Sequence, residues 1–238
     1  MAAILFIGIL SILVVHGLTY GALEGSVSAR IHFELGLSKD RSAAEIINYG
    51  LAFIAFLLLL LSYFEKRSPV LLFMALFMGF VWFDDSIGYH ERVGRLLVDG
   101  LQLEAIGGLR PQDTGEILAW AIAAVPLFVL LVIACLRRRE GDMPILAMFM
   151  IGVAMLFVCG VLADLLNIAA GKDFDLILDI VEDGGEMLAV AYMAVLSLSI
   201  SRNASTYYDR VQAQDQGDEH NYGAQTELAS TVSARGSV

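Results

Sequence analysis

The stretch Val70–Glu91, VLLFMALFMGFVWFDDSIGYHE, decides the fold of this chain. Its first 14 residues carry no charge, and as an α-helix they span roughly 21 Å. A bilayer core is about 30 Å thick, so the two aspartates that follow, Asp84 and Asp85, are expected at membrane depth. Carboxylates are costly there, and we therefore expect them to lie inside a helical bundle and to have a function or a packing role.

A second acidic stretch, DIVEDGGE, repeats this arrangement further along the chain. Its last residue, Glu186, is followed by 14 uncharged residues, so it is expected at the same depth as Asp84. Helical spacing puts four carboxylates of this stretch on one face: Asp179, Glu182, Asp183 and Glu186. Four like charges so close do not all ionise, so some hold a proton, pair with an arginine or bind a cation.

The composition places the chain in the class of integral membrane proteins. Of the 238 residues, 58% are hydrophobic and only 17% are charged. The net charge of -11 argues against nucleic acid as a partner. Cys135 and Cys159 lie in apolar runs, which indicates buried thiols rather than a disulfide framework.

The apolar runs predict an all-α, polytopic transmembrane bundle of six helices. The expected spans are residues 2–20, 43–64, 70–95, 115–136, 143–168 and 175–200. Residues 1–201 then form one membrane domain. Residues 202–238 form a polar tail with the composition of disorder, which we expect to be dispensable for folding.

Local patterns predict how some of these helices begin and bend. Ser42 and Glu45 have the spacing of a capping box, and the pair Asp113 and Glu116 indicates another helix start. On one continuous helix over 70–95, His90 would point away from Asp84, so a common site needs a bend near Gly88 or a partner helix on another side. The weakly amphipathic stretch 96–106 is expected at the membrane surface, where it could cover the site.

The basic residues indicate the orientation of the bundle. Lys66, Arg67, Arg137–Arg139 and Arg202 all lie close to helix ends on one side. By the positive-inside rule this side is cytoplasmic, with both termini inside, and we expect a multi-pass protein of the cell membrane, the inner membrane of a bacterium. The ionisable residues belong to the opposite half: His16, Asp84, Asp85, His90, Glu91, Asp164, Glu182, Asp183 and Glu186.

Two motifs support a resemblance. D-D-x4-H-E at 84–91 and E-D-G-G-E-M at 182–187 resemble a group of uncharacterised bacterial polytopic membrane proteins that carry D-(D/E)-x4-H-E and E-(D/E)-G-x-E-M. The resemblance implies that the two motifs make a common site, and it brings no established activity.

Three hypotheses follow for the function. The first is a divalent-metal site, with Mn, Fe or Ca favoured over Zn because oxygen ligands dominate. Its candidate ligands are Asp84, His90, Glu91, Glu182, Asp183 and Glu186, with His16, Asp85 and Asp164 in secondary positions. The second is an accessory or assembly subunit of a larger membrane complex, in which the acidic layer fixes helix packing. The third is a proton or cation pathway. The sequence identifies no reaction, and its expected partners are the lipid bilayer and other membrane subunits.

Overall fold

The structure of this chain, a computed structural model, describes residues 2–19, 42–163, 166, 177–178, 180–203 and 206–208. The named helices are α1 (Ala2–Thr19), α3 (Ala43–Lys66), α4 (Pro69–Ile87), α5 (Tyr89–Leu101), α6 (Pro111–Leu136), α7 (Asp142–Phe157) and the short π-helix η1 (Val158–Leu162). A further helix, Ile180–Asn203, ends the bundle, and we call it the last helix. Among the described residues no strand forms, and one isolated bridge pairs Ile106 with Leu109.

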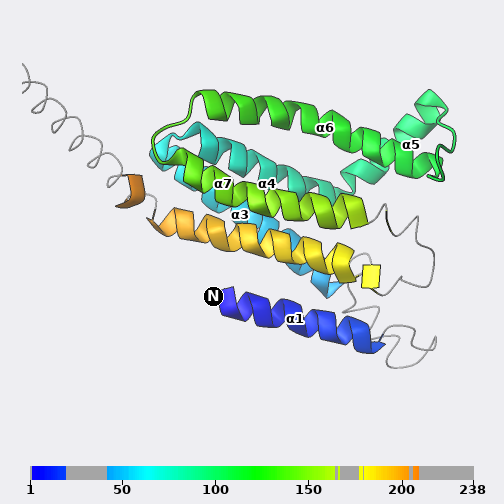
Figure 1. Cartoon of the computed structure of the whole chain (residues 1–238), viewed down its shortest axis with the longest axis horizontal. Coiled ribbons are helices and arrows are strands. Elements are labelled where there is room, and N and C mark those ends of the chain that lie inside the picture. Colours follow the sequence, from blue (N-terminus) through cyan, green and yellow to red (C-terminus); the bar gives the residue numbers. More distant parts are fainter. Residues whose placement is uncertain are drawn as a thin grey trace, which may run out of the picture.

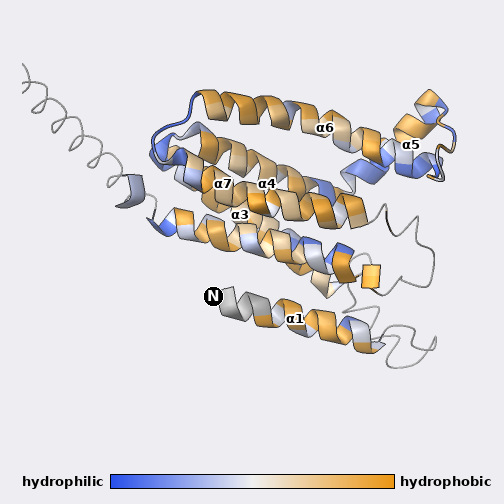
Figure 2. Cartoon of the chain, in the orientation of Figure 1, coloured by the Kyte–Doolittle hydropathy of each residue, from blue (hydrophilic) through white to orange (hydrophobic). Residues whose placement is uncertain are grey.

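The architecture confirms the predicted all-α membrane bundle. Five helices are long and apolar enough to cross a membrane: Ala43–Lys66, Pro69–Ile87, Pro111–Leu136, Asp142–Leu162 and Ile180–Asn203. The remaining predicted span, residues 2–20, corresponds to α1, whose apolar part in the described residues, Ile7–Thr19, is shorter than the other five. Figure 1 shows the long helices lying side by side, and Figure 2 shows polar residues gathered at their ends.

The helices α3 and α4 form a tight hairpin. The hydroxyl of Ser42 accepts a hydrogen bond from the backbone N–H of Glu45 at the start of α3, as the predicted cap requires. Ser68 caps α4 in the same way, and Pro69 occupies the first turn, where a missing N–H costs nothing. Between them Arg67 adopts a left-handed conformation (φ 54°) that reverses the chain.

The core lies between this hairpin, α7 and the last helix. Small residues on α3, such as Ala52 and Ala55, allow α4 to approach closely, and both are fully buried. Phe149 of α7 packs edge-on against Phe73 and Phe77 of α4, at ring-centroid distances of 6.5 Å and 5.7 Å. Edge-to-face packing of this kind suits the quadrupoles of the rings, so α7 is fixed in orientation as well as in position.

The outer surface of the bundle is apolar. On α6 the side chains of Val125 and Phe128 are 64% and 65% exposed. A soluble protein rarely exposes a contiguous apolar surface of this kind, whereas lipid tails cover it without cost. These exposed faces are the ones that we assign to the bilayer.

Two predicted boundaries differ in the structure. The span predicted at 70–95 is broken, because α4 ends at Ile87 and α5 leaves it through Gly88 (φ 61°). The helix predicted to begin near residue 115 begins at Pro111, with Arg110 as its cap and Asp113 accepting hydrogen bonds from Arg110. Asp113 is therefore the third residue of the helix and not its cap.

At one end, the turns between α3 and α4 and between α6 and α7 carry Lys66, Arg67 and Arg137–Arg139, and we call this the basic end. Asp142 is fully buried there and accepts hydrogen bonds from Ser68 (2.9 Å), Tyr208 (2.5 Å) and the backbone N–H of Arg139 (2.7 Å). Burial and the bond to Asp142 raise the pKa of Tyr208 above its ordinary value, which keeps its hydroxyl a donor.

The segment after the last helix is thus joined to two turns of the bundle. Tyr208 is only 3% exposed, and Tyr207 donates a hydrogen bond to the carbonyl of Gly141 (2.9 Å). The packed bundle therefore reaches at least Tyr208, beyond the boundary at 201 that we predicted. The rest of the predicted tail lies outside the described residues.

Candidate functional site

At the opposite end of the bundle, which we call the acidic end, Asp84 and His90 form a closely bonded pair. Asp84 is fully buried in the last turn of α4. Its Oδ1 accepts a hydrogen bond from the backbone N–H of His90, and its Oδ2 lies 2.9 Å from Nδ1 of the same residue. Because an ionised carboxylate can only accept, Nδ1 carries a proton. In the neutral imidazole, Nε2 is then the nitrogen with a free lone pair.

The break at Gly88 creates this pair. Its left-handed backbone (φ 61°, ψ 51°) suits glycine, because a side chain would strain it. The N–H of Gly88 closes α4 on the carbonyl of Asp84, and its own carbonyl accepts from Arg92 to open α5. His90 therefore folds back over the end of α4, where Asp84 satisfies a backbone N–H that the new helix leaves free.

Aromatic rings surround the imidazole on one side. The rings of His90 and Trp120 lie 6.0 Å apart at an angle of 30°, and Phe80 packs edge-on against both Trp120 and Tyr89. The side chain of His90 is still 29% exposed. The pair is therefore fixed in a mostly apolar setting, yet the imidazole remains reachable from outside the bundle.

The charges around His90 favour its protonated form. Burial alone would lower the pKa of His90, but its hydrogen bond to Asp84 and the negative charge of that carboxylate outweigh burial. Glu116 and Glu91 add to the effect from further away. The pKa of His90 is consequently raised above its ordinary value.

A second group of carboxylates lies beside this pair. Glu186 of the last helix interacts electrostatically most strongly with Asp85 of α4, and then with Asp183, Glu182 and Asp84. Asp85 in turn interacts with Asp84, His90 and Glu45. The structure thus brings the two sequence motifs, which are almost 100 residues apart in the chain, within electrostatic reach of each other.

Glycines let the last helix approach η1 closely at this level. A Cβ atom on Gly160 would collide with the carboxylate of Glu186, and a Cβ atom on Gly185 would collide with the sulfur of Cys159. The side chain of Glu186 thus packs against Gly160 of η1, and the side chain of Cys159 packs against Gly185 of the last helix. Glu186 therefore lies against the backbone of a π-helical turn, a local distortion that is frequent at functional sites.

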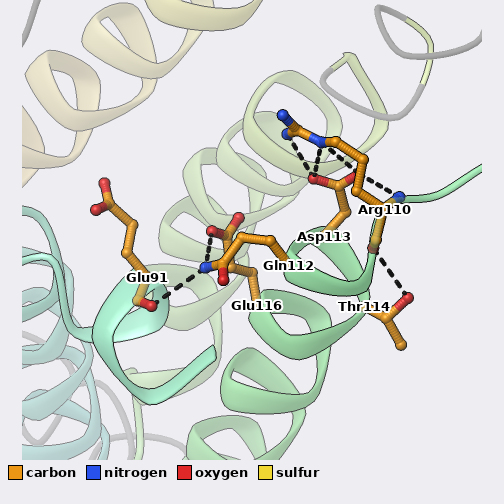
Figure 3. A network of polar contacts seen from close by, with 6 residues as sticks. All are labelled: Glu91, Arg110, Gln112, Asp113, Thr114 and Glu116. Atoms are coloured by element: carbon orange, nitrogen blue, oxygen red, sulfur yellow. Dashed lines mark hydrogen bonds and ion pairs between the residues drawn. The ribbon is translucent and has the colours of Figure 1, made fainter. Parts of the chain in front are cut away.

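Glu91 forms an ion pair with Arg95, and its side chain makes no hydrogen bond to Asp84 or His90 in the described part of the chain. Its side chain is half exposed and lies 3.7 Å from Arg95. Gln112 donates hydrogen bonds to the backbone carbonyl of Glu91 (3.2 Å) and to Glu116 (2.7 Å). Figure 3 shows this network, in which the carboxylate of Glu91 points away from Gln112. Gln112 therefore helps to hold α5 against α6, and the role of Glu91 as a metal ligand stays a prediction.

Three other predicted residues lie on described helices: Glu182, Asp183 and His16. Glu182 and Asp183 are partly buried on the last helix. His16 is fully buried on α1, two turns beyond Ile9, which packs against Ala44 and Met187. Asp164 and Asp179 lie outside the described residues, so their predicted places stay predictions.

No three His, Cys, Asp or Glu side chains come together as a metal site in the described part of the chain. The divalent metal that the sequence suggested, whether Mn, Fe or Ca, therefore stays a prediction. What the structure brings together is a histidine held by an aspartate and, next to it, carboxylates from two helices.

Sequence reasoning missed several residues of this end. Trp120 and Gln112 carried no motif, and Gly160 was one glycine among 22. Asn48 is only 6% exposed, and its Oδ1 has no hydrogen-bond partner among the described residues. Asn48 lies among alanines on the buried face of α3, and a polar residue in that pattern was the one signal that could have identified it.

Comparison with known proteins gives a family but no activity. A family model for a domain of unknown function, DUF8692, matches residues 41–200, from the start of α3 to the last helix. Neither the curated proteins nor the solved structures contain a match to this chain. The match agrees with the expected uncharacterised family, while the shared motifs and the bacterial origin stay predictions. Since the matched region covers more than half of the sequence, the chain belongs to the DUF8692 family.

Proposed function

We propose that this membrane protein transfers protons at the acidic end of its bundle, with Asp84 and His90 as the reacting pair. The observation that carries the proposal is the double contact of Asp84, which is fully buried and bonded to both the backbone N–H and Nδ1 of His90. A histidine oriented in this way by a carboxylate is suited to general-base work.

The chemistry follows from the free nitrogen. Nε2 of His90 takes a proton from a water molecule or a hydroxyl group that reaches it, and the imidazole becomes an imidazolium. The negative charge of Asp84, 2.9 Å away, stabilises that cation without moving. The exposed part of the His90 side chain supplies access, and the ring of Trp120, itself packed edge-on against Phe80, lies beside the imidazole.

Asp85 and Glu186 are suited to pass the proton on. They come from different helices, and each lies within electrostatic reach of the Asp84–His90 pair. In the described helices, however, no charged side chain lies between this end and the basic end, and residues such as Met74, Met78 and Met193 fill the space. The proposal therefore concerns chemistry at one membrane face and not conduction across the bilayer.

A divalent metal at His90 is the second candidate function. In many metal sites a histidine donates its other N–H to a carboxylate, as His90 does to Asp84. The same orientation would leave Nε2 to bind the metal, with Glu116 nearby. The two candidates differ in one respect, because a bound metal would block Nε2 from reacting until a chelator removes it.

Carbethoxylation of histidine tests the proposal, because the reagent attacks only an unprotonated imidazole nitrogen. We expect His90 to be modified with a pH midpoint above the ordinary value of about 6.5, since its pKa is raised. In Asp84→Asn the midpoint should fall, because the hydrogen bond to a charged partner and the neighbouring charge are gone. Mass spectrometry of the modified peptide measures both.

Asp113→Asn is the matched control, because Asp113 pairs with Arg110 and should leave the midpoint of His90 unchanged. His16, fully buried, should stay unmodified in the folded protein. Equal midpoints in wild type and Asp84→Asn would contradict the proposal. Protection of His90 that is lost after chelation would favour the metal instead.

A further inference from the structure

The basic end carries exposed guanidinium groups that the described fold does not use in ion pairs, and three of them lie in its two turns. Arg67, Arg137 and Arg138 are exposed, and none of them has an acidic partner within ion-pair distance in the part of the chain that the structure describes. Among the described arginines at the acidic end, Arg95 contacts Glu91 and Arg110 contacts Asp113, while Arg92 has no ion pair. Most of the unpaired arginines in the described part of the chain thus lie at the basic end.

Buried bonds keep these cations together although they come from different turns. Ser68, next to Arg67, donates a hydrogen bond to Asp142, and Arg139, next to Arg138, donates to the backbone carbonyl of Lys66. The turn between α3 and α4 is thereby fixed to the turn between α6 and α7. The two turns that carry the arginines therefore do not need to be brought together when a ligand binds, which lowers the entropy cost of binding.

The position of the group matches the headgroup layer of a bilayer. All three arginines directly follow apolar helices, at Lys66 and at Leu136. The guanidinium of Arg67 lies over the rings of Tyr63 and Phe64, at 5.9 Å and 5.6 Å from their centroids. Aromatic residues with one polar side are typical of the membrane–water interface.

We propose that Arg67, Arg137 and Arg138 form a binding surface for the phosphate groups of anionic phospholipids. Guanidinium groups bind phosphate oxygens in pairs, and clusters of basic residues next to membrane helices attract anionic lipid. The predicted cytoplasmic orientation of this end agrees with the proposal, because the cytoplasmic leaflet is the anionic one. This inference is independent of the chemistry proposed for His90.

The test compares melting temperatures in lipid nanodiscs of two compositions, phosphatidylcholine alone and phosphatidylcholine with phosphatidylglycerol. A lipid that binds the folded state raises the melting temperature, and we expect this rise in wild type. Arg137→Gln/Arg138→Gln should lose most of it, and Arg67→Gln should lose part. Taking the difference between the two lipids for each variant removes any direct effect of the substitution on stability.

Arg92→Gln/Arg95→Gln is the matched control, because it removes two exposed arginines from α5 at the other end. This control should keep the full rise with phosphatidylglycerol. Free inorganic phosphate at the same concentration should give no rise, since the proposed ligand is the lipid. A full rise in Arg137→Gln/Arg138→Gln, or an equal loss in the control, would overturn the proposal.

Discussion

Replacing Asp142 by alanine should destabilise the bundle by about 3 kcal/mol, because buried donors would lose a charged acceptor. In the wild type, Asp142 accepts from Ser68, Tyr208 and the backbone N–H of Arg139. The two hydroxyls come from different parts of the chain and would be left in a dry site. The free energy of unfolding in detergent micelles, measured with denaturant, gives the size of the loss.

Two variants show whether the effect comes from these bonds. Glu140→Ala changes an exposed carboxylate in the same turn and should leave stability within about 0.5 kcal/mol of wild type. Tyr208→Phe removes one donor and should cost about 1 kcal/mol. If Asp142→Ala unfolded at the same denaturant concentration as wild type, the hydrogen-bonded network at the basic end would not be a source of stability.

Gly115→Ala should cost about 2 to 3 kcal/mol, because α5 and α6 touch through their backbones at this point. A Cβ atom on Gly115 would lie 2.5 Å from the carbonyl oxygen of Gly94 and 2.9 Å from Val98. Neither a carbonyl group nor a packed helix can move aside without separating the two helices. Since α5 carries His90, the substitution should also loosen the contact with Asp84.

Gly100→Ala, on α5, provides the control for Gly115→Ala on α6. No atom lies within 4 Å of the place where its Cβ would be, so alanine should be tolerated there. The comparison separates crowding from the ordinary effect of exchanging glycine for alanine in a helix. Equal stability of Gly115→Ala and Gly100→Ala would show that the two helices are not in backbone contact.

The all-α bundle of apolar helices could be predicted because hydrophobicity largely determines it. The uncharged run before Asp84 and the one after Glu186 have the same length, and the structure brings these residues to one end of the bundle. The cap at Ser42 was predictable for a similar reason, since it depends on residues three positions apart. Local rules and solvent preference were sufficient in these places.

The pairing of His90 with Asp84 could not be predicted in the same way. Helical periodicity assumes an unbroken helix, and on such a helix the two side chains point in different directions. The break between α4 and α5 depends on the left-handed conformation of Gly88 and on the hydrogen bonds that Asp84 accepts from His90 across it. Periodicity shows that a common site needs a bend near Gly88, but it does not show which contacts the bend makes.

Contacts between distant parts of the chain could not be predicted from the sequence either. Nothing in the local sequence links Tyr208 to Asp142, and composition alone assigned Tyr208 to the tail. The contact of Glu186 with the backbone at Gly160 likewise depends on how two helices cross. Such contacts follow from the packing of the whole bundle, which periodicity does not determine.

The state of the imidazole of His90 tests the central claim most directly. In histidine-labelled protein, nitrogen NMR distinguishes the two neutral tautomers and follows their titration. We predict that His90 is protonated on Nδ1 when neutral and that its pKa lies above the ordinary value. Asp84→Asn should lower that pKa and remove the preference for this tautomer. Asp85→Asn should change the pKa less and keep the tautomer, because Asp84 is the carboxylate that hydrogen-bonds to His90. A neutral His90 protonated on Nε2, or a pKa that does not respond to Asp84→Asn, would contradict the account.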